Sequence, residues 1–241
     1  MRRWRVEGPA GVVDFQLHGL ETDESGLARA AALLSDDEMG RAGRLRFPED
    51  QRRFVMARAT LRRILADYIG SSAPSHIRFE YSQHGKPGLS WSGDGARPSF
   101  NASHSGERLL VGVVAEGEIG VDIECHRPLR DQDALVRRYF SDAENEAYFR
   151  LPTESRAAGF FGCWTRKEAF VKALGRGLTF PLRDFDVEFT NGGQGLSRLH
   201  GDAQAPRRWT LEGFEPEVGY SAAFALHGRF GRLQRTGQCD R

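Results

Sequence analysis

The chain has 241 residues, and its hydrophobic content of 39% and charged content of 28% are typical of a soluble globular protein with one large or two small domains. Its formal net charge of +1 gives no general argument for binding nucleic acid or a membrane surface, so any anion-binding site must be local. No apolar run approaches the roughly 20 residues that span a bilayer, and the basic first residues lack the apolar core of a signal peptide.

Cysteine and lysine are both scarce. The three cysteines are scattered without metal-ligand spacing, so we expect reduced thiols and a cytoplasmic protein. Only three of the 34 basic residues are lysines, namely Lys86, Lys167 and Lys172. On a solvated surface lysine and arginine are nearly exchangeable, whereas a compact ammonium is distinct where it meets a phosphate or a reacting atom. The three lysines are therefore candidates for chemistry, and chance is the competing explanation.

The first part of the chain predicts a strand followed by helices. The strand is expected at 12–17, a short helix after the capping box at 35–38, and a long helix from about 49 to 69. The long helix carries many arginines outside its apolar face. Such a face is usually solvated, but arginine pairs bidentately with phosphate, so a phosphate-binding role for two or three of them is the alternative.

Two turns carry polar residues that suit an anion. After a short strand at 77–81, the run Gly85-Lys86-Pro87 places a lysine on a rigid, exposed corner. The segment 99–107 contains Asn101, Ser103 and His104 among small residues, and its backbone amides could form an anion-binding nest. The alternative is that these side chains only satisfy the backbone groups of their own turn.

An apolar strand at 109–114 is followed by a break at 116–118 and a second strand at 119–124. Alternation along the second strand puts Asp122 and Glu124 on one face. Neighbouring carboxylates repel each other unless a cation lies between them, and an oxygen-only site suits Mg²⁺ or Mn²⁺ rather than zinc. The alternative is a pair of exposed carboxylates on a solvated face.

The later part of the chain predicts a long helix over 153–174. Glu168 and Lys172 lie four residues apart and therefore stack one turn above the other, an order that also suits a simple surface ion pair. Lys167 falls inside the apolar stripe, where an ammonium needs a partner. Short helices are expected over 133–150, strands near 185–189, 209–214 and 220–226, and a frayed tail from 228 onward.

Three of these segments, in this order and spacing, resemble the signatures of the Sfp-type 4′-phosphopantetheinyl transferases, which convert apo carrier proteins to their holo form. They are FNASHS at 100–105, GVDIE at 120–124 and WTRKEAFVK at 164–172, and GKP at 85–87 is a fourth match. The resemblance extends over about residues 46–189. It implies an α+β fold of two similar halves related by a pseudo-two-fold axis, 1–117 on the nucleotide side and 118–241 on the metal and catalytic side, with coenzyme A in the cleft between them.

The resemblance also implies the metal and catalytic residues. Asp122, Glu124 and Glu168 would bind Mg²⁺, with Mn²⁺ as a substitute, and the metal would also bind the pyrophosphate of coenzyme A. Glu168 would take the proton of the attacking serine, directly or through a metal-bound water. Lys172 would stabilise the leaving α-phosphate.

The remaining implied contacts hold coenzyme A. Ser103 and His104, with Asn101 beside them, would meet the 3′-phosphate and ribose end, and Asp122 would also belong to this set through the metal. Lys86 would flank the adenine and phosphate region, and Lys167 and Lys172 would lie against the pyrophosphate. Family members often use lysines before the long helix for the 3′-phosphate. This chain has none there, so the candidates to replace them are Arg46, Arg53 and Arg58.

The implied reaction is transfer of 4′-phosphopantetheine from coenzyme A to a serine of an apo acyl or peptidyl carrier protein, with release of 3′,5′-ADP, by a monomer in the cytoplasm. Two alternatives are a binding module that has lost catalysis and a Mg²⁺-dependent nucleotide phosphohydrolase. The sequence does not indicate which carrier is modified or whether acyl-coenzyme A is accepted. Arg137 and Arg138 could meet an acidic carrier helix, although a solvated face is the simpler explanation.

Overall fold

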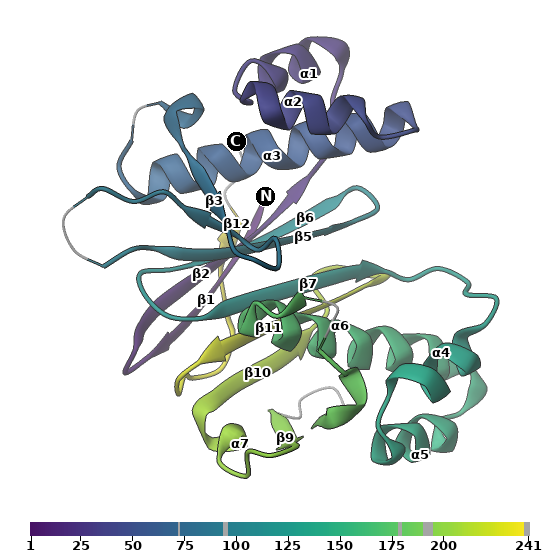
Figure 1. Cartoon of the computed structure of the whole chain (residues 1–241). Coiled ribbons are helices and arrows are strands. Elements are labelled where there is room, and N and C mark those ends of the chain that lie inside the picture. Colours follow the sequence, from purple (N-terminus) through teal and green to yellow (C-terminus); the bar gives the residue numbers. More distant parts are fainter. Residues whose placement is uncertain (72, 94–95, 178–179, 190–194, 239–241) are drawn as a thin grey trace.

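The computed structural model describes residues 1–71, 73–93, 96–177, 180–189 and 195–238 (Figure 1). The strands are β1 Arg2–Gly8, β2 Gly11–Gly19, β3 Phe79–Tyr81, β4 Pro87–Leu89, β5 Ser99–Ser105, β6 Arg108–Val114, β7 Ile119–Cys125, β8 Phe185–Val187, β9 Leu196–Leu199, β10 Trp209–Phe214, β11 Tyr220–His227 and β12 Gln234–Gln238. The helices are α1 Glu24–Ala31, α2 Asp36–Gly43, α3 Pro48–Tyr68, α4 Gln132–Tyr139, α5 Asp142–Arg150, α6 Arg156–Leu174 and α7 Ala205–Arg208, with 3₁₀ turns at Pro74–His76, Thr153–Ser155 and Leu182–Asp184.

The N-terminal half is an antiparallel sheet with a long helix on one face. The strand order is β12-β1-β2-β6-β5, and α3 packs against β6 through Leu61, Leu65, Val111 and Val113. Helices α1 and α2 lie on the far side of α3 from the sheet (Figure 1). The short hairpin of β3 and β4 ends in the Gly85-Lys86-Pro87 corner.

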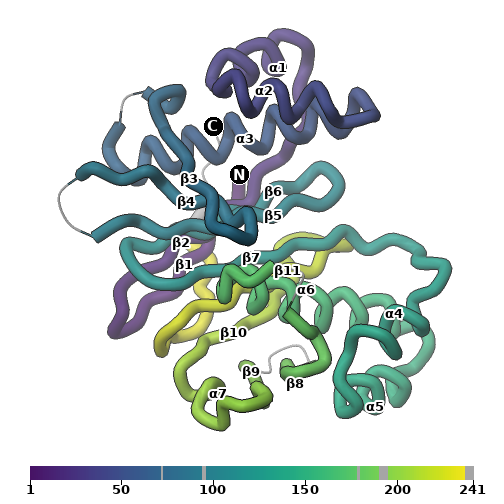
Figure 2. The backbone as a smooth tube through the Cα atoms, in the orientation of Figure 1, coloured from purple at the N-terminus to yellow at the C-terminus, as the bar shows by residue number. Residues whose placement is uncertain are grey.

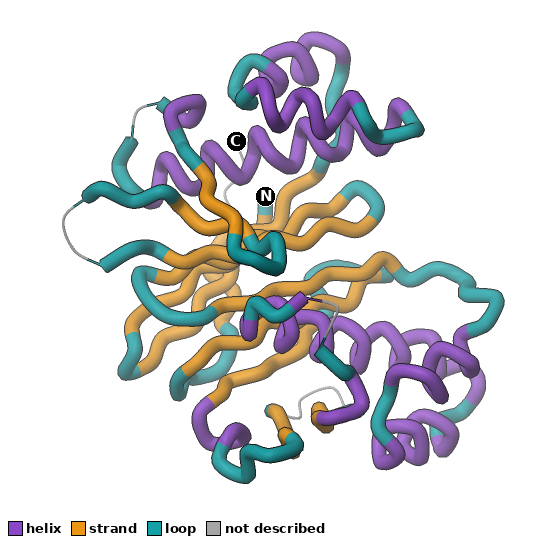
Figure 3. Tube along the Cα trace, viewed as in Figure 1, coloured by secondary structure: helices purple, strands orange, loops and turns teal. Residues whose placement is uncertain are grey.

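The C-terminal half repeats this plan with a smaller sheet. Its strand order is β10-β11-β7, again antiparallel, and α6 packs on it through Phe161, Ala169 and Phe170, which share a core with Ala223 and Ala225 of β11. Figure 3 shows the strands of both halves gathered in the middle of the molecule, with the long helices outside them. The predicted α+β class with two similar halves is therefore confirmed.

A third core joins the halves. Val121 and Ile123 of β7 pack in one cluster with Phe15 of β2 and Leu110 of β6. The tube in Figure 2 shows β7 running along the boundary between the two sheets. Strand β7 thus has one face in the shared core and its other face towards α6, which confirms the alternation predicted for this strand.

The end of the chain differs from the expectation. The tail from 228 was expected to be frayed, but Gln234 and Arg235 of β12 pair with Arg5 and Trp4 of β1. The last described strand of the chain therefore belongs to the sheet of the N-terminal half. Pairing of this kind depends on a partner strand far away in sequence, so local composition carries no signal for it.

Two further findings bear on the first expectations. Cys125 and Cys163 are free thiols, while Cys239 lies outside the described residues. Across the described ranges, none of the helices combines the length and the apolar character needed to traverse a lipid bilayer.

Candidate active site

Strands β5 and β7 are joined by side chains rather than by backbone pairing. Asn101 Oδ1 accepts a hydrogen bond from the backbone N–H of Val121 at 2.8 Å. Ser103 Oγ donates to Asp122 Oδ1 at 2.8 Å, and Ser105 Oγ donates to Glu124 Oε2 at 2.8 Å. Three alternate residues of β5 thus hold the acidic strand of the other half. Ser103, which is predicted to contact coenzyme A, donates its hydroxyl proton to Asp122 in this structure.

Helix α6 approaches β7 unusually closely at Gly120. A Cβ atom added to Gly120 would lie 2.0 Å from the carbonyl oxygen of Ala169 and 2.4 Å from the backbone nitrogen of Ala173. Only glycine permits this approach. The close packing brings Glu168 and Lys172, on the same stretch of α6, over Asp122 of β7.

Gly120→Ala is expected to destabilise the fold by about 3 kcal/mol or more, because the methyl group meets helix backbone rather than a side chain that can move. Urea unfolding followed by circular dichroism measures the change. Gly43→Ala is the matched control, since an added Cβ there meets no atom within 4 Å. Equal stability of the two variants would contradict the close approach.

Lys172 and Asp122 form the centre of the site. Lys172 Nζ lies 2.5 Å from Asp122 Oδ1 and donates to Ser103 Oγ at 2.9 Å. Asp122 is only 4% exposed. Burial raises the pKa of Asp122 above its usual range, against the opposing effect of Lys172. The position of this carboxylate inside the protein excludes the alternative of two exposed carboxylates on a solvated face.

Glu168 lies one turn before Lys172 on α6. Burial, and after it the negative charge of Asp122, raises the pKa of Glu168, whereas Lys172 opposes the shift. Glu124 also acts on Glu168 electrostatically, so the three carboxylates influence one another as a group. Glu168 Oε1 and Asp122 Oδ2 are both buried without a hydrogen-bond partner.

These carboxylates fit a divalent cation by their chemistry. Two buried carboxylate oxygens without partners are costly unless a cation or a proton reaches them, and oxygen ligands suit Mg²⁺ and Mn²⁺. In the described part of the chain, however, no three His, Cys, Asp or Glu side chains are already arranged as a metal centre. Glu124 is held by Ser105 and by Arg127 at 3.0 Å, and the ammonium of Lys172 lies against Asp122.

A pocket of about 230 Å³ adjoins this cluster on the side of the N-terminal half. Its walls combine the Gly85-Lys86-Pro87 corner, Asn101 of β5, and Lys172 of α6. It therefore unites three of the predicted coenzyme A contacts from both halves. Glu168 lines a different pocket of about 490 Å³, together with Trp164 and Val171 of α6 and residues 180–184.

His104 and Arg53 lie near Lys172. The side chain of His104 is exposed, and partial desolvation followed by the positive charges of Lys172 and Arg53 lowers its pKa. Arg53 Nε donates to Glu107 Oε1 at 2.7 Å, and its side chain stays partly exposed. Of the three candidate arginines, Arg53 is thus the one whose charge acts on His104.

The other two candidate arginines lie differently. Arg58 is ion-paired with the buried Glu38 at 2.6 Å and lies over the ring of Phe79, so its guanidinium stabilises the α2–α3 contact. Its expected role at a phosphate does not fit this position. Arg46 is exposed just before α3, stacks on Phe47, and pairs with no carboxylate among the described residues.

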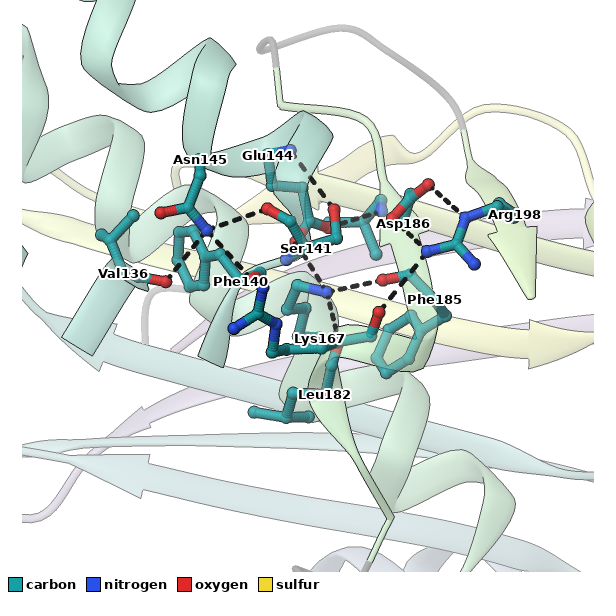
Figure 4. Close-up of polar contacts among 12 residues, drawn as sticks. Val136, Phe140, Ser141, Glu144, Asn145, Lys167, Leu182, Phe185, Asp186 and Arg198 are labelled. Atoms are coloured by element: carbon teal, nitrogen blue, oxygen red, sulfur yellow. Dashed lines mark hydrogen bonds and ion pairs between the residues drawn. The ribbon is translucent and has the colours of Figure 1, made fainter. Parts of the chain in front are cut away.

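The position of Lys167 differs from the one that the resemblance implied. Its ammonium is fully buried, 2.7 Å from Glu144 Oε2, and it donates to the carbonyl oxygens of Leu182 at 2.7 Å and Phe185 at 2.8 Å (Figure 4). The three donors of an ammonium are thereby used. Lys167 does not lie against a pyrophosphate, and the expectation was wrong. The partner that an ammonium in an apolar stripe requires is Glu144, the carboxylate of the capping box that starts α5.

Lys86 also has partners that the sequence did not indicate. Its ammonium donates to the carbonyl oxygens of Ile119 at 2.9 Å and Ala173 at 3.1 Å. Ile119 begins β7 and Ala173 belongs to the last turn of α6. Lys86 thus ties the corner of the first half to two elements of the second half.

Comparison with known proteins shows the family of this chain. The family model described as 4′-phosphopantetheinyl transferase superfamily matches residues 118–225, and the model of the N-terminal part of 4′-phosphopantetheinyl transferases matches residues 21–117. The chain is 37% identical over 212 residues to the 4′-phosphopantetheinyl transferase HetI of Nostoc sp., covering 87% of this chain and 85% of that protein. The chain belongs to the 4′-phosphopantetheinyl transferase superfamily.

More distant members of this superfamily cover a similar share of the chain. The 4′-phosphopantetheinyl transferase Sfp of Bacillus subtilis is 28% identical over 203 residues, 84% of this chain and 86% of its own length. The human L-aminoadipate-semialdehyde dehydrogenase-phosphopantetheinyl transferase is 27% identical over 211 residues, 82% of this chain and 68% of its own length. The similarity therefore extends over most of the chain.

Proposed function

We propose that this protein transfers 4′-phosphopantetheine from coenzyme A to a serine of an apo carrier protein, with Mg²⁺ as the metal and 3′,5′-ADP as the second product. The observation that supports it most is the junction of Asp122, Glu168 and Lys172 beside a pocket lined by residues of both halves. This transfer requires three kinds of group. Carboxylates bind the cation, an ammonium binds a phosphate, and a carboxylate oxygen without a partner accepts a proton.

Glu168 and Lys172 divide the chemistry. The serine oxygen of the carrier attacks the β-phosphorus of coenzyme A, the bond from that phosphorus to the bridging oxygen breaks, and the serine proton passes to Glu168. The α-phosphate leaves as part of 3′,5′-ADP, and Lys172 stabilises the charge that develops on it. When bound, Mg²⁺ would be held by Asp122, Glu168 and Glu124 and would neutralise the charge of the diphosphate.

The nucleotide end of coenzyme A would occupy the cleft between the two halves of the protein. We assign the 3′-phosphate to His104 with Arg53, and with Arg46 just before α3, because these side chains are exposed or partly exposed. Asn101 and Ser103 support the site from β5, since their side chains already hold β7 and Asp122. We expect the enzyme to act as a monomer in the cytoplasm on acyl or peptidyl carriers, without nucleic acid or membrane partners.

Intact-mass analysis of an apo carrier protein incubated with this chain, coenzyme A and Mg²⁺ tests the proposal. A gain of one phosphopantetheine group on the carrier is the expected result. Lack of any gain across fatty-acid, polyketide and peptide carriers would favour a binding module without catalysis. Release of 3′,5′-ADP in the absence of a carrier would favour a phosphohydrolase.

Asp122→Ala is expected to raise the Mg²⁺ concentration for half-maximal transfer by about tenfold or more, because it removes a buried carboxylate from the proposed metal site. A Mg²⁺ titration of the transfer rate measures this shift. Asp67→Ala, at an exposed position of α3, is the control. An unchanged titration in Asp122→Ala would remove Asp122 from the metal site.

A further inference from the structure

The pocket beside Lys172 lies at the carboxyl end of helix α6, which disfavours the binding of an anion. Helix α6 runs over 19 residues and ends at Leu174, with Gly175 in the left-handed conformation at φ 65°. The pocket is lined by Lys172, Gly175 and Gly177, around the carboxyl end of that helix. The last carbonyl groups of a helix lack intrahelical partners, and the helix dipole is negative there. A phosphate placed in this pocket is therefore repelled unless the end of the helix is neutralised.

Lys86 supplies the compensating charge. Its ammonium lies 3.1 Å from the carbonyl oxygen of Ala173, in the last turn of α6, and 2.9 Å from that of Ile119. The stem of Lys86 packs on the turn that follows the helix, where a Cβ atom added to Gly175 would lie 3.5 Å from Lys86 Cδ. The side chain is half-buried and lines the same pocket as Lys172.

We propose that Lys86 is a positioning residue that neutralises the carboxyl end of α6 and holds it to β7, so that the diphosphate of coenzyme A can bind beside Lys172. The inference rests on the function proposed above and changes the role expected for Lys86. A side chain that donates to Ala173 and Ile119 acts on the ligand through the helix end and through Lys172. It does not need to touch a phosphate or the adenine.

The test compares coenzyme A binding by calorimetry in excess Mg²⁺, without carrier protein, for the wild type and three variants. Lys86→Met removes the charge, and Lys86→Gln keeps N–H donors without the charge, so both are expected to weaken binding about tenfold. Lys86→Arg keeps the charge and has N–H donors for both carbonyl oxygens, and it is expected to bind within about threefold of the wild type. A Lys86→Met protein that binds as tightly as the wild type overturns the inference.

A second ligand separates this role from a direct contact. Coenzyme A without its 3′-phosphate should show the same loss in Lys86→Met, because the helix end acts on the diphosphate. A loss confined to intact coenzyme A would mean that Lys86 touches the 3′-phosphate, and it would overturn the proposal. If the wild type itself does not bind coenzyme A, the proposed function fails instead.

The pH dependence of coenzyme A affinity distinguishes the charge of Lys86 from its packing, because packing alone does not change with pH. Burial lowers the pKa of Lys86 to about 8, with Glu118 opposing the shift. Coenzyme A affinity of the wild type should therefore fall as pH rises from 7 to 9, while that of Lys86→Arg should not. The other charged or titratable residues that line the two pockets on either side of Lys86 are common to both proteins, namely Glu80, Tyr81, His84, Arg97, Glu118 and Lys172. Parallel profiles would overturn the proposal.

Discussion

Glu168→Gln is expected to lower the transfer rate by roughly 10²–10⁴-fold while coenzyme A binding remains measurable. The amide keeps the size of the side chain but cannot accept the serine proton. The position supports this role, since Glu168 Oε1 is buried without a partner and the side chain lines the pocket next to Trp164. Single-turnover transfer to a carrier protein measures the rate, and calorimetry measures binding.

The control for this variant is Glu146→Gln on α5, where the carboxylate is exposed and pairs with Arg150 at 3.0 Å. It should transfer at the wild-type rate. Unimpaired turnover in Glu168→Gln would exclude Glu168 as the base and leave a water molecule or another group to take the proton. Loss of both transfer and coenzyme A binding would assign Glu168 to ligand binding rather than to proton transfer.

Lys167→Met is expected to reduce the free energy of unfolding by about 3–5 kcal/mol, because it leaves the buried Glu144 carboxylate without its ion-pair partner. For a chain of this size the melting temperature should fall by roughly 10 °C. Urea unfolding followed by circular dichroism measures the change. If Lys167 instead contacted a phosphate, the variant would keep its stability and lose coenzyme A affinity.

A second variant makes this prediction sharper. The double variant Lys167→Met with Glu144→Gln removes the unpaired charge, while the amide of Gln can still accept the hydrogen bond from Val187 N–H at 2.8 Å. It should be more stable than Lys167→Met alone. A double variant less stable than the single one would show that the carboxylate contributes through its backbone contacts rather than through Lys167.

Local patterns predicted the acidic strand well. Alternation placed Asp122 and Glu124 on one face of β7 and Val121 and Ile123 on the other. The structure confirms this, and it shows in addition that the two apolar residues lie in the shared core. The periodicity of α6 also placed Lys167 in the apolar stripe, where it is fully buried. These features depend on neighbours two to four residues away, which the sequence displays directly.

Partners from distant elements could not be predicted in this way. The sequence showed that Lys167 needed a counter-charge, but not that Glu144 on α5 provides it. Lys86 donates to the backbone carbonyls of Ile119 and Ala173. Every residue has a backbone carbonyl, so the sequence does not indicate which one accepts a hydrogen bond. The two lysines were therefore assigned to phosphates from the resemblance, although packing of the two halves decides what each one touches.

The pairing of β12 with β1 affects the tendency of the protein to associate with other copies of itself. Figure 1 marks the N-terminus beside these strands, and β12 is the outermost strand of its sheet. A shortened chain that stops before Gln234 would leave the outward-facing backbone amides and carbonyls of β1 unpaired at a sheet margin. Open margins of this kind invite strand exchange and aggregation between molecules. The last described strand thus covers the outer edge of β1, at a place remote from the proposed chemistry.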